Sequence, residues 1–295
     1  MKNLLFIYNP RSGKGLIRTH LVDIIDIFTK ADYLVTVHPT QKSGDARFFA
    51  REHGEEYDLV VASGGDGTLD EVVNGMMESN CDVPIGYIPS GSTNDFGSSL
   101  SIPKDMLEAA NRIVNGHLFP CDIGGFNDKN FVYVAAFGMF TEVSYETDQG
   151  MKNSLGHVAY VLEAAKKVWN IPALHMKIES KEYSGEGNFA YGMVSNAKSI
   201  GGLKNLTGDN VELDDGLLEV TLVHSPTNPK ELSEILTSMF MGDSSSPLVE
   251  KFQTERITFT SEHEVSWTMD GERGGDHKEV VICNRKQRLN FVSFM

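Results

Sequence analysis

One short stretch constrains this chain most: an apolar run that stops at a cluster of glycines. Residues 60–62 are Val-Val-Ala, and after Ser63 the chain reads Gly64-Gly65-Asp66-Gly67-Thr68. Beyond the glycines, apolar residues recur with the spacing i, i+3, i+4 and i+7, namely Leu69, Val72, Val73 and Met76. This spacing predicts an amphipathic helix, so the unit is a buried strand, a glycine-rich turn and a helix.

The turn in this unit has the chemistry of a phosphate site. Glycine lets the backbone approach a ligand closely, and the unpaired N–H groups at a helix N-terminus attract an anion. Asp66 would be repelled by the same phosphate unless a divalent cation or a hydroxyl donor lay between them. A phosphate cradle that contains a carboxylate indicates metal-assisted phosphoryl transfer, although a glycine-rich turn alone is a common structural feature.

Two further polar loops also follow predicted strands. Residues 9–15 come after the apolar run 4–8, and they are not a Walker A loop because the spacing G-x-x-x-x-G-K-[ST] is absent. Residues 89–96 come after the apolar run 84–88. Because the carboxyl ends of parallel strands meet at one edge of a sheet, we expect the three loops to line a single crevice.

The pattern of apolar segments predicts two domains. Up to residue 125, expected strands at 4–8, 34–37, 59–62, 84–88 and 119–123 alternate with helical patterns, including a helix over 106–115, which is typical of a doubly wound parallel sheet. Residues 126–284 hold short β-rich segments typical of an antiparallel β-sandwich-like domain, with helices over 158–169 and 231–240. The closing segment, about 285–295, is expected to return to the first domain.

The β-rich segments of the second domain are expected at residues 131–136, 174–178, 191–194, 217–223, 257–260, 265–269, 279–282 and 289–292, the last of these lying in the returning segment.

The composition narrows the function classes. At 295 residues, with 40% hydrophobic and 23% charged residues, the chain is long enough for two globular domains. Three cysteines with no C-x-x-C pair argue for a reducing compartment and against a disulfide framework or a structural zinc site. Neither the H-E-x-x-H pattern of zinc hydrolases nor the G-x-S-x-G elbow of serine hydrolases occurs in the sequence.

Charge and hydropathy limit the partners. The formal net charge of −15 disfavours binding to nucleic acid and opposes general adsorption to anionic lipid. No apolar run approaches the roughly 18 residues that a membrane-spanning helix needs. The apolar run after Asn3 is too short for a signal peptide and is interpreted as a first strand. Any contact with a membrane is therefore expected to be peripheral and transient.

The three loops together resemble one enzyme family. N-P-x-S-G-K at residues 9–14, G-G-D-G-T at 64–68 and P-x-G-[ST]-T-N-D-F at 89–96 are similar to the diacylglycerol kinase catalytic domain, in its bacterial soluble lipid-kinase branch. Ser92 departs from the usual threonine but keeps the hydroxyl. NAD kinase and 6-phosphofructokinase share G-G-D-G, and the N-D-F motif favours the lipid kinases. The resemblance is specific over roughly the first hundred residues and extends more thinly to Met295.

The resemblance implies an NAD kinase/diacylglycerol kinase-like fold and a reaction. The expected activity is transfer of the γ-phosphoryl group of ATP to the primary hydroxyl of diacylglycerol or a similar lipid, with ATP as co-substrate and Mg²⁺ as cofactor. The protein is expected to be cytoplasmic and to meet its lipid substrate at the inner face of the membrane. No nucleic-acid partner is expected, and a homodimer is one expected form of the protein. The residues expected to contact the nucleotide are Asn9, Pro10, Arg11, Ser12, Gly13, Lys14, Thr40, Gly64, Gly65, Asp66, Gly67, Thr68 and Thr93.

The resemblance also assigns catalytic carboxylates. On spacing alone, Asp270-Gly271-Glu272 is an ordinary surface turn, because D-G is a common turn dipeptide. A D-G-E at this place in lipid kinases carries the general base, which makes Glu272 the candidate base for the substrate hydroxyl. Asp122, by itself a turn or hinge residue, is expected beside Asp66 and Asp95, where the three would hold Mg²⁺ or its waters.

A second acidic cluster lies in the β-rich domain. Residues 212–217 read Glu-Leu-Asp-Asp-Gly-Leu, which alone is typical of a solvated hairpin turn. The resemblance implies a separate structural Mg²⁺ site here. The carboxylate of Asp215 and the backbone carbonyls of Glu212 and Leu217 would be its ligands, completed by water.

Two alternatives remain open. One is a kinase for another alcohol, such as NAD or a sphingoid base. The other is a non-catalytic regulator that binds a nucleotide or a lipid. Intact Asp66, Asp95 and Glu272 argue against the regulator, because a binding module has no need of a base.

Overall fold

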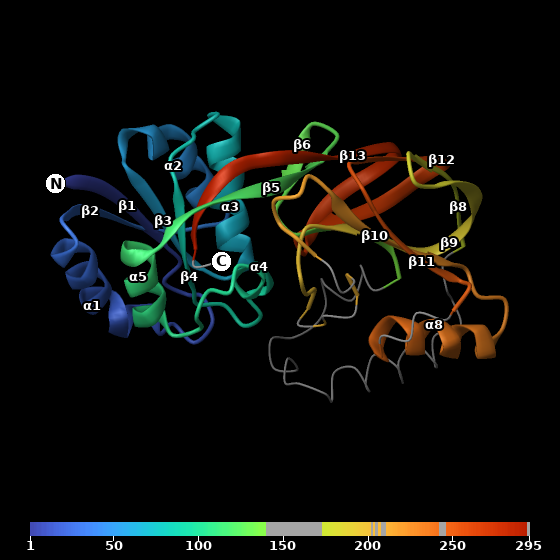
Figure 1. The fold of residues 1–295 in the computed structure, drawn as a ribbon, viewed down its shortest axis with the longest axis horizontal. Helices are drawn as coiled ribbons and strands as arrows, with labels where there is room; N and C mark the ends of the chain where they lie inside the picture. Colours follow the sequence, from blue (N-terminus) through green and yellow to red (C-terminus); the bar gives the residue numbers. More distant parts are fainter. Residues whose placement is uncertain (140–172, 202, 204–205, 208–210, 242–245, 294–295) are drawn as a thin grey trace. The chain divides into compact units, whose positions relative to one another are not determined.

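The computed structural model describes residues 1–139, 173–201, 203, 206–207, 211–241 and 246–293, and the chain divides into two units. The first unit comprises Met1–Ile123 and Lys286–Met295, and the second comprises Gly124–Arg285. The chain leaves the first unit within strand β5 (His117–Phe126) and returns to it within β13 (Glu272–Ser293), the strands drawn in green and red in Figure 1.

The first unit is built on a parallel sheet. Strands β1 (Lys2–Tyr8), β2 (Tyr33–Pro39), β3 (Leu59–Gly64) and β4 (Ile85–Pro89) pair in parallel in the order β2-β1-β3-β4. Its helices are α1 (Ile17–Lys30), α2 (Asp45–His53), the 3₁₀ helix η1 (Gly54–Glu56), α3 (Asp66–Glu78), α4 (Asp95–Ser99) and α5 (Met106–Asn115).

Helices cover both faces of this sheet, because strand side chains alternate between the faces. On one face, apolar residues of the strands form a core with residues of α1 and α5, among them Leu4, Phe6, Val61, Ile24, Phe28 and Ala110. The alternate residues Leu5, Ile7 and Val60 are also fully buried, and α3 packs on β3 and against α2. This arrangement confirms the doubly wound parallel sheet.

The returning segment completes the first unit. The Gln287 backbone N–H donates to Asp122 Oδ1 at 2.7 Å, and Phe291 pairs in parallel with Ile85 of β4. Its ring packs edge-on against Phe96, with 5.1 Å between the centroids. Residues near the end of the sequence therefore contact the loop and short helix that follow β4.

The second unit is antiparallel. Its further strands are β6 (Lys129–Phe131), β7 (Val134–Gly138), β8 (Leu174–Ser180), β9 (Ser184–Ser195), β10 (Leu218–His224), β11 (Val249–Thr254) and β12 (Arg256–Met269), with helix α8 (Pro229–Met241). Among the described residues, the strand pairs of this unit run antiparallel, including β8 with β9, β10 with β11 and β12 with β13. The core gathers around Trp267, whose ring meets Phe126, Phe137 and Phe259 edge-on at centroid distances of 5.2, 4.8 and 5.1 Å.

Several expected strand boundaries are wrong in this unit. Residues 257–260 and 265–269 belong to one strand, β12, whose register shifts between Thr260 and Val265 where exposed polar side chains interrupt the pattern. Residues 279–282 and 289–292 both lie in β13, and residues 131–136 are divided between β6 and β7. Strand β11 has a half-buried, mixed pattern and was not predicted. The helix expected over 158–169 lies outside the described residues.

Among the residues that the structure describes, none of the helices combines the length and the apolar character required to cross a membrane.

Candidate functional site

The GGDGT loop (residues 64–68) joins a buried strand to a helix N-terminus. Strand β3 ends at Gly64, and α3 begins at Asp66. A Cβ on Gly64 would lie 2.3 Å from the Thr68 side chain, so the turn requires glycine there. Gly67 is exposed, and a Cβ on it would have no neighbour within 4 Å. The helix N-terminus therefore has free space beside Gly67, as an anion site requires.

The NPRSGK loop (residues 9–14) and the SGSTND loop (residues 90–95) meet this turn. The Asn9 N–H donates to the Ser63 carbonyl and the Ser90 N–H donates to the Gly64 carbonyl, both at 2.8 Å. A Cβ on Gly13 would lie 2.2 Å from the Ser90 carbonyl oxygen, and one on Gly91 would lie 2.5 Å from Gly65 Cα. The predicted meeting of the three loops at one edge of the sheet is confirmed.

The NPRSGK loop is shaped by its first residue. Asn9 Oδ1 accepts from the Arg11 N–H at 2.9 Å, and the Asn9 carbonyl accepts from the Ser12 N–H at 3.2 Å. The side chains of Arg11 and Lys14 are exposed. Thr40 follows β2 at the same edge of the sheet, where its N–H donates to the Tyr8 carbonyl at 2.9 Å.

Two acidic residues occupy adjoining loops. Asp66 is half-buried, and its Oδ1 accepts from the Phe96 N–H at 3.4 Å. Asp95, only 4% exposed, is the first residue of α4. Burial, followed by the charges of Asp66 and Asp95, raises the pKa of the Tyr87 phenol well above its usual range. Both carboxylates therefore lie near one buried tyrosine.

Asp122 has a different environment. It is fully buried in β5 and accepts the hydrogen bond from the Gln287 N–H. The described part of the chain contains no group of three or more His, Cys, Asp and Glu side chains placed to hold a metal ion. Asp66, Asp95 and Asp122 thus do not form a ready cage of three carboxylates.

The sequence analysis missed Tyr87, and it included Asn94 in the N-D-F motif without giving it a role of its own. Tyr87 lies in β4, and its hydroxyl is 3.1 Å from the Gly64 carbonyl and 3.3 Å from Asn94 Oδ1. Asn94 has a positive φ of 55°, and it exchanges two hydrogen bonds of 2.9 Å with the backbone of Gly91. The available signals were a phenol in an otherwise apolar strand, which needs a partner, and an asparagine before a short helix.

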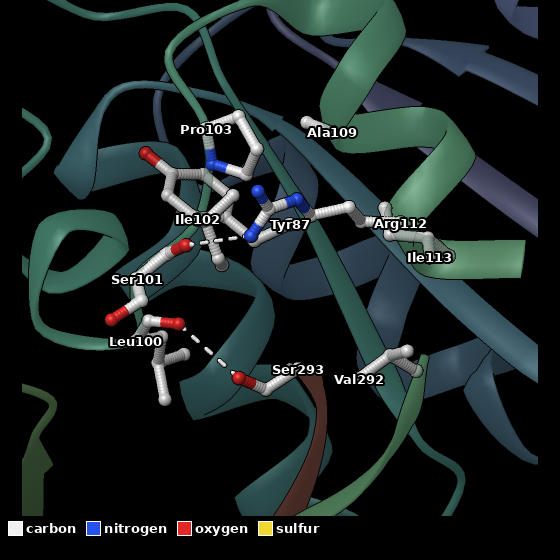
Figure 2. A pocket seen from close by; sticks show the side chains of 10 residues that line it. All are labelled: Tyr87, Leu100, Ser101, Ile102, Pro103, Ala109, Arg112, Ile113, Val292 and Ser293. Atoms are coloured by element: carbon white, nitrogen blue, oxygen red, sulfur yellow. Dashed lines mark hydrogen bonds between the residues drawn. The ribbon is translucent and has the colours of Figure 1, made fainter. Parts of the chain in front are cut away.

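Tyr87 also borders a small cavity in the first unit (Figure 2). The cavity measures about 10 Å³, and Arg112 lines it with a hydrogen bond of 3.4 Å to the Ser101 carbonyl. The Ser293 hydroxyl closes another side by donating to the Leu100 carbonyl at 3.2 Å. This volume admits one water molecule at most, so the cavity is too small for a nucleotide.

The turn at residues 270–272 belongs to the second unit. Glu272 is exposed at the start of β13, directly after Asp270 and Gly271, which have φ values of 50° and 83°. Asp270 is only 5% exposed, and its carboxylate accepts from the backbone N–H groups of Val132, Tyr133 and Val134 at 2.6, 3.0 and 2.9 Å. Although spacing alone is typical of an ordinary surface turn, Asp270 is buried and anchors the turn that carries Glu272.

Replacing Asp270 with alanine is expected to lower the free energy of unfolding by at least about 3 kcal/mol, because three buried N–H groups lose a charged acceptor. Urea denaturation followed by circular dichroism measures this change. Asp128→Ala, in an exposed turn of the same unit, is the matched control and should change little. A loss below about 1 kcal/mol for Asp270→Ala would contradict the anchoring role.

The acidic turn at residues 212–217 is held by side-chain to backbone bonds. Asp215 Oδ1 accepts from the Leu217 N–H at 2.8 Å, and Gly216 has a φ of 92°. The Leu217 carbonyl accepts from Asn284 Nδ2 at 2.9 Å, and Glu212 is exposed. The turn is thus ordered by its own sequence and tied to β13.

Comparison with known proteins identifies relatives over nearly the whole chain. The diacylglycerol kinase catalytic domain matches residues 3–126, and the YegS C-terminal NAD kinase beta sandwich-like domain matches residues 134–287. A diacylglycerol kinase of Staphylococcus epidermidis is 36% identical over 276 residues, which cover 93% of this chain and 87% of that protein. Its counterpart in Staphylococcus saprophyticus is 34% identical, with 93% and 90% covered.

Solved structures agree with these matches. The crystal structure of a protein from Bacillus anthracis superposes on this chain with a TM-score of 0.84 and 27% sequence identity. The superposition covers 99% of this chain and 95% of the other. The crystal structure of a diacylglycerol kinase from the same organism gives a TM-score of 0.79 at 23% identity, over 99% and 97%. The expected fold, an α/β domain followed by a β-sandwich-like domain, is confirmed.

Proposed function

The chain belongs to the diacylglycerol kinase family, and from this premise we propose that it transfers the γ-phosphoryl group of ATP to the primary hydroxyl of diacylglycerol or a similar lipid. The family consists of phosphotransferases with an alcohol acceptor. The observation that carries the proposal is the meeting of three loops around the N-terminus of α3, joined by the Asn9–Ser63 and Ser90–Gly64 hydrogen bonds.

The nucleotide is assigned to these loops. Exposed Gly67 leaves the first turn of α3 open to a phosphate, and α3 has 13 residues, enough for a substantial helix dipole. The assigned contacts are residues 9–14, Thr40, residues 64–68 and Thr93. Arg11 and Lys14 are exposed and free to reorient toward phosphate oxygens.

Asp66 and Asp95 fit a magnesium ion that arrives with the nucleotide. Mg²⁺ keeps several waters and takes one or two carboxylates together with substrate phosphates, and two carboxylates on adjoining loops meet that need. When bound, the ion would offset the negative charge of the phosphates. We assign Asp122 a supporting role, because its carboxylate already accepts from the Gln287 N–H.

Glu272 is assigned as the general base. Its side chain is exposed, and the anchored Asp270 beside it fixes the turn from which it projects. Its role is to accept the proton of the lipid hydroxyl. The transition state of phosphoryl transfer is loose, so a strong base is not required. A carboxylate that orients the hydroxyl and takes the proton late is sufficient.

We also assign a structural Mg²⁺ to the acidic turn of Glu212, Asp215 and Leu217. A carboxylate with backbone carbonyls and water is a suitable oxygen environment for this hard cation. Asp215→Ala is then expected to lower Tm in Mg²⁺ and to abolish most of its dependence on the metal. Binding to the folded state alone would stabilise it by about 2.7 kcal/mol at a hundred times Kd.

Thermal unfolding with and without Mg²⁺ measures this effect. Asp214→Ala, which removes the neighbouring charge, is the matched control. An unchanged metal-dependent shift in Asp215→Ala would mean that the segment is an ordinary hairpin turn.

The proposed cellular location follows from the lipid substrate. We propose a cytoplasmic protein that meets the inner face of the membrane peripherally and transiently, and we regard a homodimer as compatible with this role.

The decisive experiment offers radiolabelled ATP and Mg²⁺ to the purified protein with three acceptors in parallel: diacylglycerol in mixed micelles, a sphingoid base and NAD. Label is expected in phosphatidic acid. Label in another acceptor would replace the substrate assignment. Binding of ATP with no transfer to any acceptor would favour a regulator.

A further inference from the structure

Tyr87 joins the two loops that carry the acidic residues. Its hydroxyl lies 3.1 Å from the Gly64 carbonyl, in the loop that continues to Asp66. The same hydroxyl lies 3.3 Å from Oδ1 of Asn94, the residue directly before Asp95. A phenol has one hydrogen, so it is shared between these two acceptors or alternates between them.

The surroundings fix the tyrosine ring. Tyr87 is fully buried, and a Cβ on Gly97 of α4 would lie 3.0 Å from its Cε1. Glycine at this position therefore lets the short helix that begins with Asp95 sit directly on the ring. Asn94 Oδ1 also accepts from the Gly91 N–H at 2.9 Å, so the contact extends into the SGSTND loop.

The phenol is suited to a permanent donor role. Burial, followed by the charges of Asp66 and Asp95, raises the pKa of the phenol, so the hydroxyl stays protonated and can donate to the Gly64 carbonyl or to Asn94 Oδ1. The Gly64 carbonyl and Asn94 Oδ1 each have a backbone donor as well, from Ser90 and Gly91. The buried phenol itself needs a hydrogen-bond partner, so it favours the placement in which both loops lie within reach of its hydroxyl.

We propose that Tyr87 is a positioning residue that sets the spacing of Asp66 and Asp95 for Mg–ATP, an inference that rests on the proposed kinase function. If only the apolar ring of Tyr87 mattered, phenylalanine at this position would serve as well as tyrosine. The hydroxyl therefore separates the two roles.

Tyr87→Phe keeps the ring and removes only the hydroxyl. We expect it to weaken Mg–ATP binding about tenfold, the effect of one lost hydrogen bond, and to raise KM for ATP similarly while leaving KM for the lipid unchanged. Calorimetric titration of the protein with Mg–ATP, without any lipid, measures the affinity. In the nucleotide-free protein, amide exchange at Gly91 and Phe96 should become faster.

Tyr183→Phe is the matched control, because it removes a hydroxyl that bonds Glu250 in the second unit at 3.3 Å. It should leave ATP affinity unchanged. Asn94→Gly removes one acceptor and tolerates the positive φ. If Tyr87 acts through Asn94, Tyr87→Phe should weaken Mg–ATP binding less in the Asn94→Gly protein than it does in the wild type.

The outcomes are distinct. Wild-type ATP affinity and loop exchange in a folded Tyr87→Phe protein would overturn the proposal. Should that variant fail to fold, unchanged ATP affinity in folded Asn94→Gly would overturn it equally. A wild-type protein that binds no Mg–ATP would instead refute the proposed kinase function.

Discussion

Glu272→Gln is expected to lower kcat by about 10²–10⁴ and to leave the affinity for ATP unchanged. Glutamine preserves the shape and one acceptor oxygen but cannot take the proton of the lipid hydroxyl. The nucleotide is assigned to loops of the first unit, whereas Glu272 lies at the start of β13 in the second. Steady-state rates and calorimetric ATP titration on the same preparation measure both quantities.

Glu264→Gln, an exposed glutamate on β12, is the control for the loss of a surface charge. Two results would disprove the assignment of Glu272: abolished ATP binding, or a kcat within a few-fold of the wild type. Asp95 would then be the next candidate for the base.

Asp66→Asn is expected to lower turnover by about 100- to 1,000-fold, the usual effect of losing one preorganised electrostatic contact. The asparagine oxygen can still accept from the Phe96 N–H, so the loop contact seen at 3.4 Å is retained while the charge is removed. The measured quantities are kcat at saturating Mg²⁺ and the concentration of Mg²⁺ that gives half-maximal rate.

The matched control is Asp105→Asn at the N-cap of α5, where the side chain accepts from the Glu108 N–H at 2.8 Å. Asparagine is an equally good cap, so the activity should stay at the wild-type value. A folded Asp66→Asn protein that keeps more than about a tenth of the wild-type kcat would exclude the assigned role.

Local patterns were sufficient to predict much of the first unit. The helical spacing after Gly67 placed α3, and the three strand-loop sequences placed their loops at one edge of a parallel sheet. These features depend on periodicity and on glycine, which are properties of neighbouring residues. The family resemblance, carried by the same loops, was confirmed by the matches over residues 3–126 and 134–287.

Contacts between distant residues were not predictable in this way. Asp270 is buried because its carboxylate bonds the backbone of Tyr133, 137 positions earlier in the chain. Tyr87 looked like any apolar strand residue until Asn94 and Gly64 were seen to share its hydroxyl. Strand β12 continues past a polar interruption because β13 pairs with it on both sides of the register shift.

The returning segment has a consequence for biosynthesis. Phe291 contacts Phe96 beside the SGSTND loop, and Gln287 holds Asp122, so the nucleotide loops are completed by residues that leave the ribosome nearly two hundred positions after them. Most of the chain, including the whole second unit, must emerge before the first unit can close. During translation, the parallel sheet of the first unit therefore lacks the β13 partner of β4, and such an unpaired strand edge is open to non-native pairing until the last residues emerge.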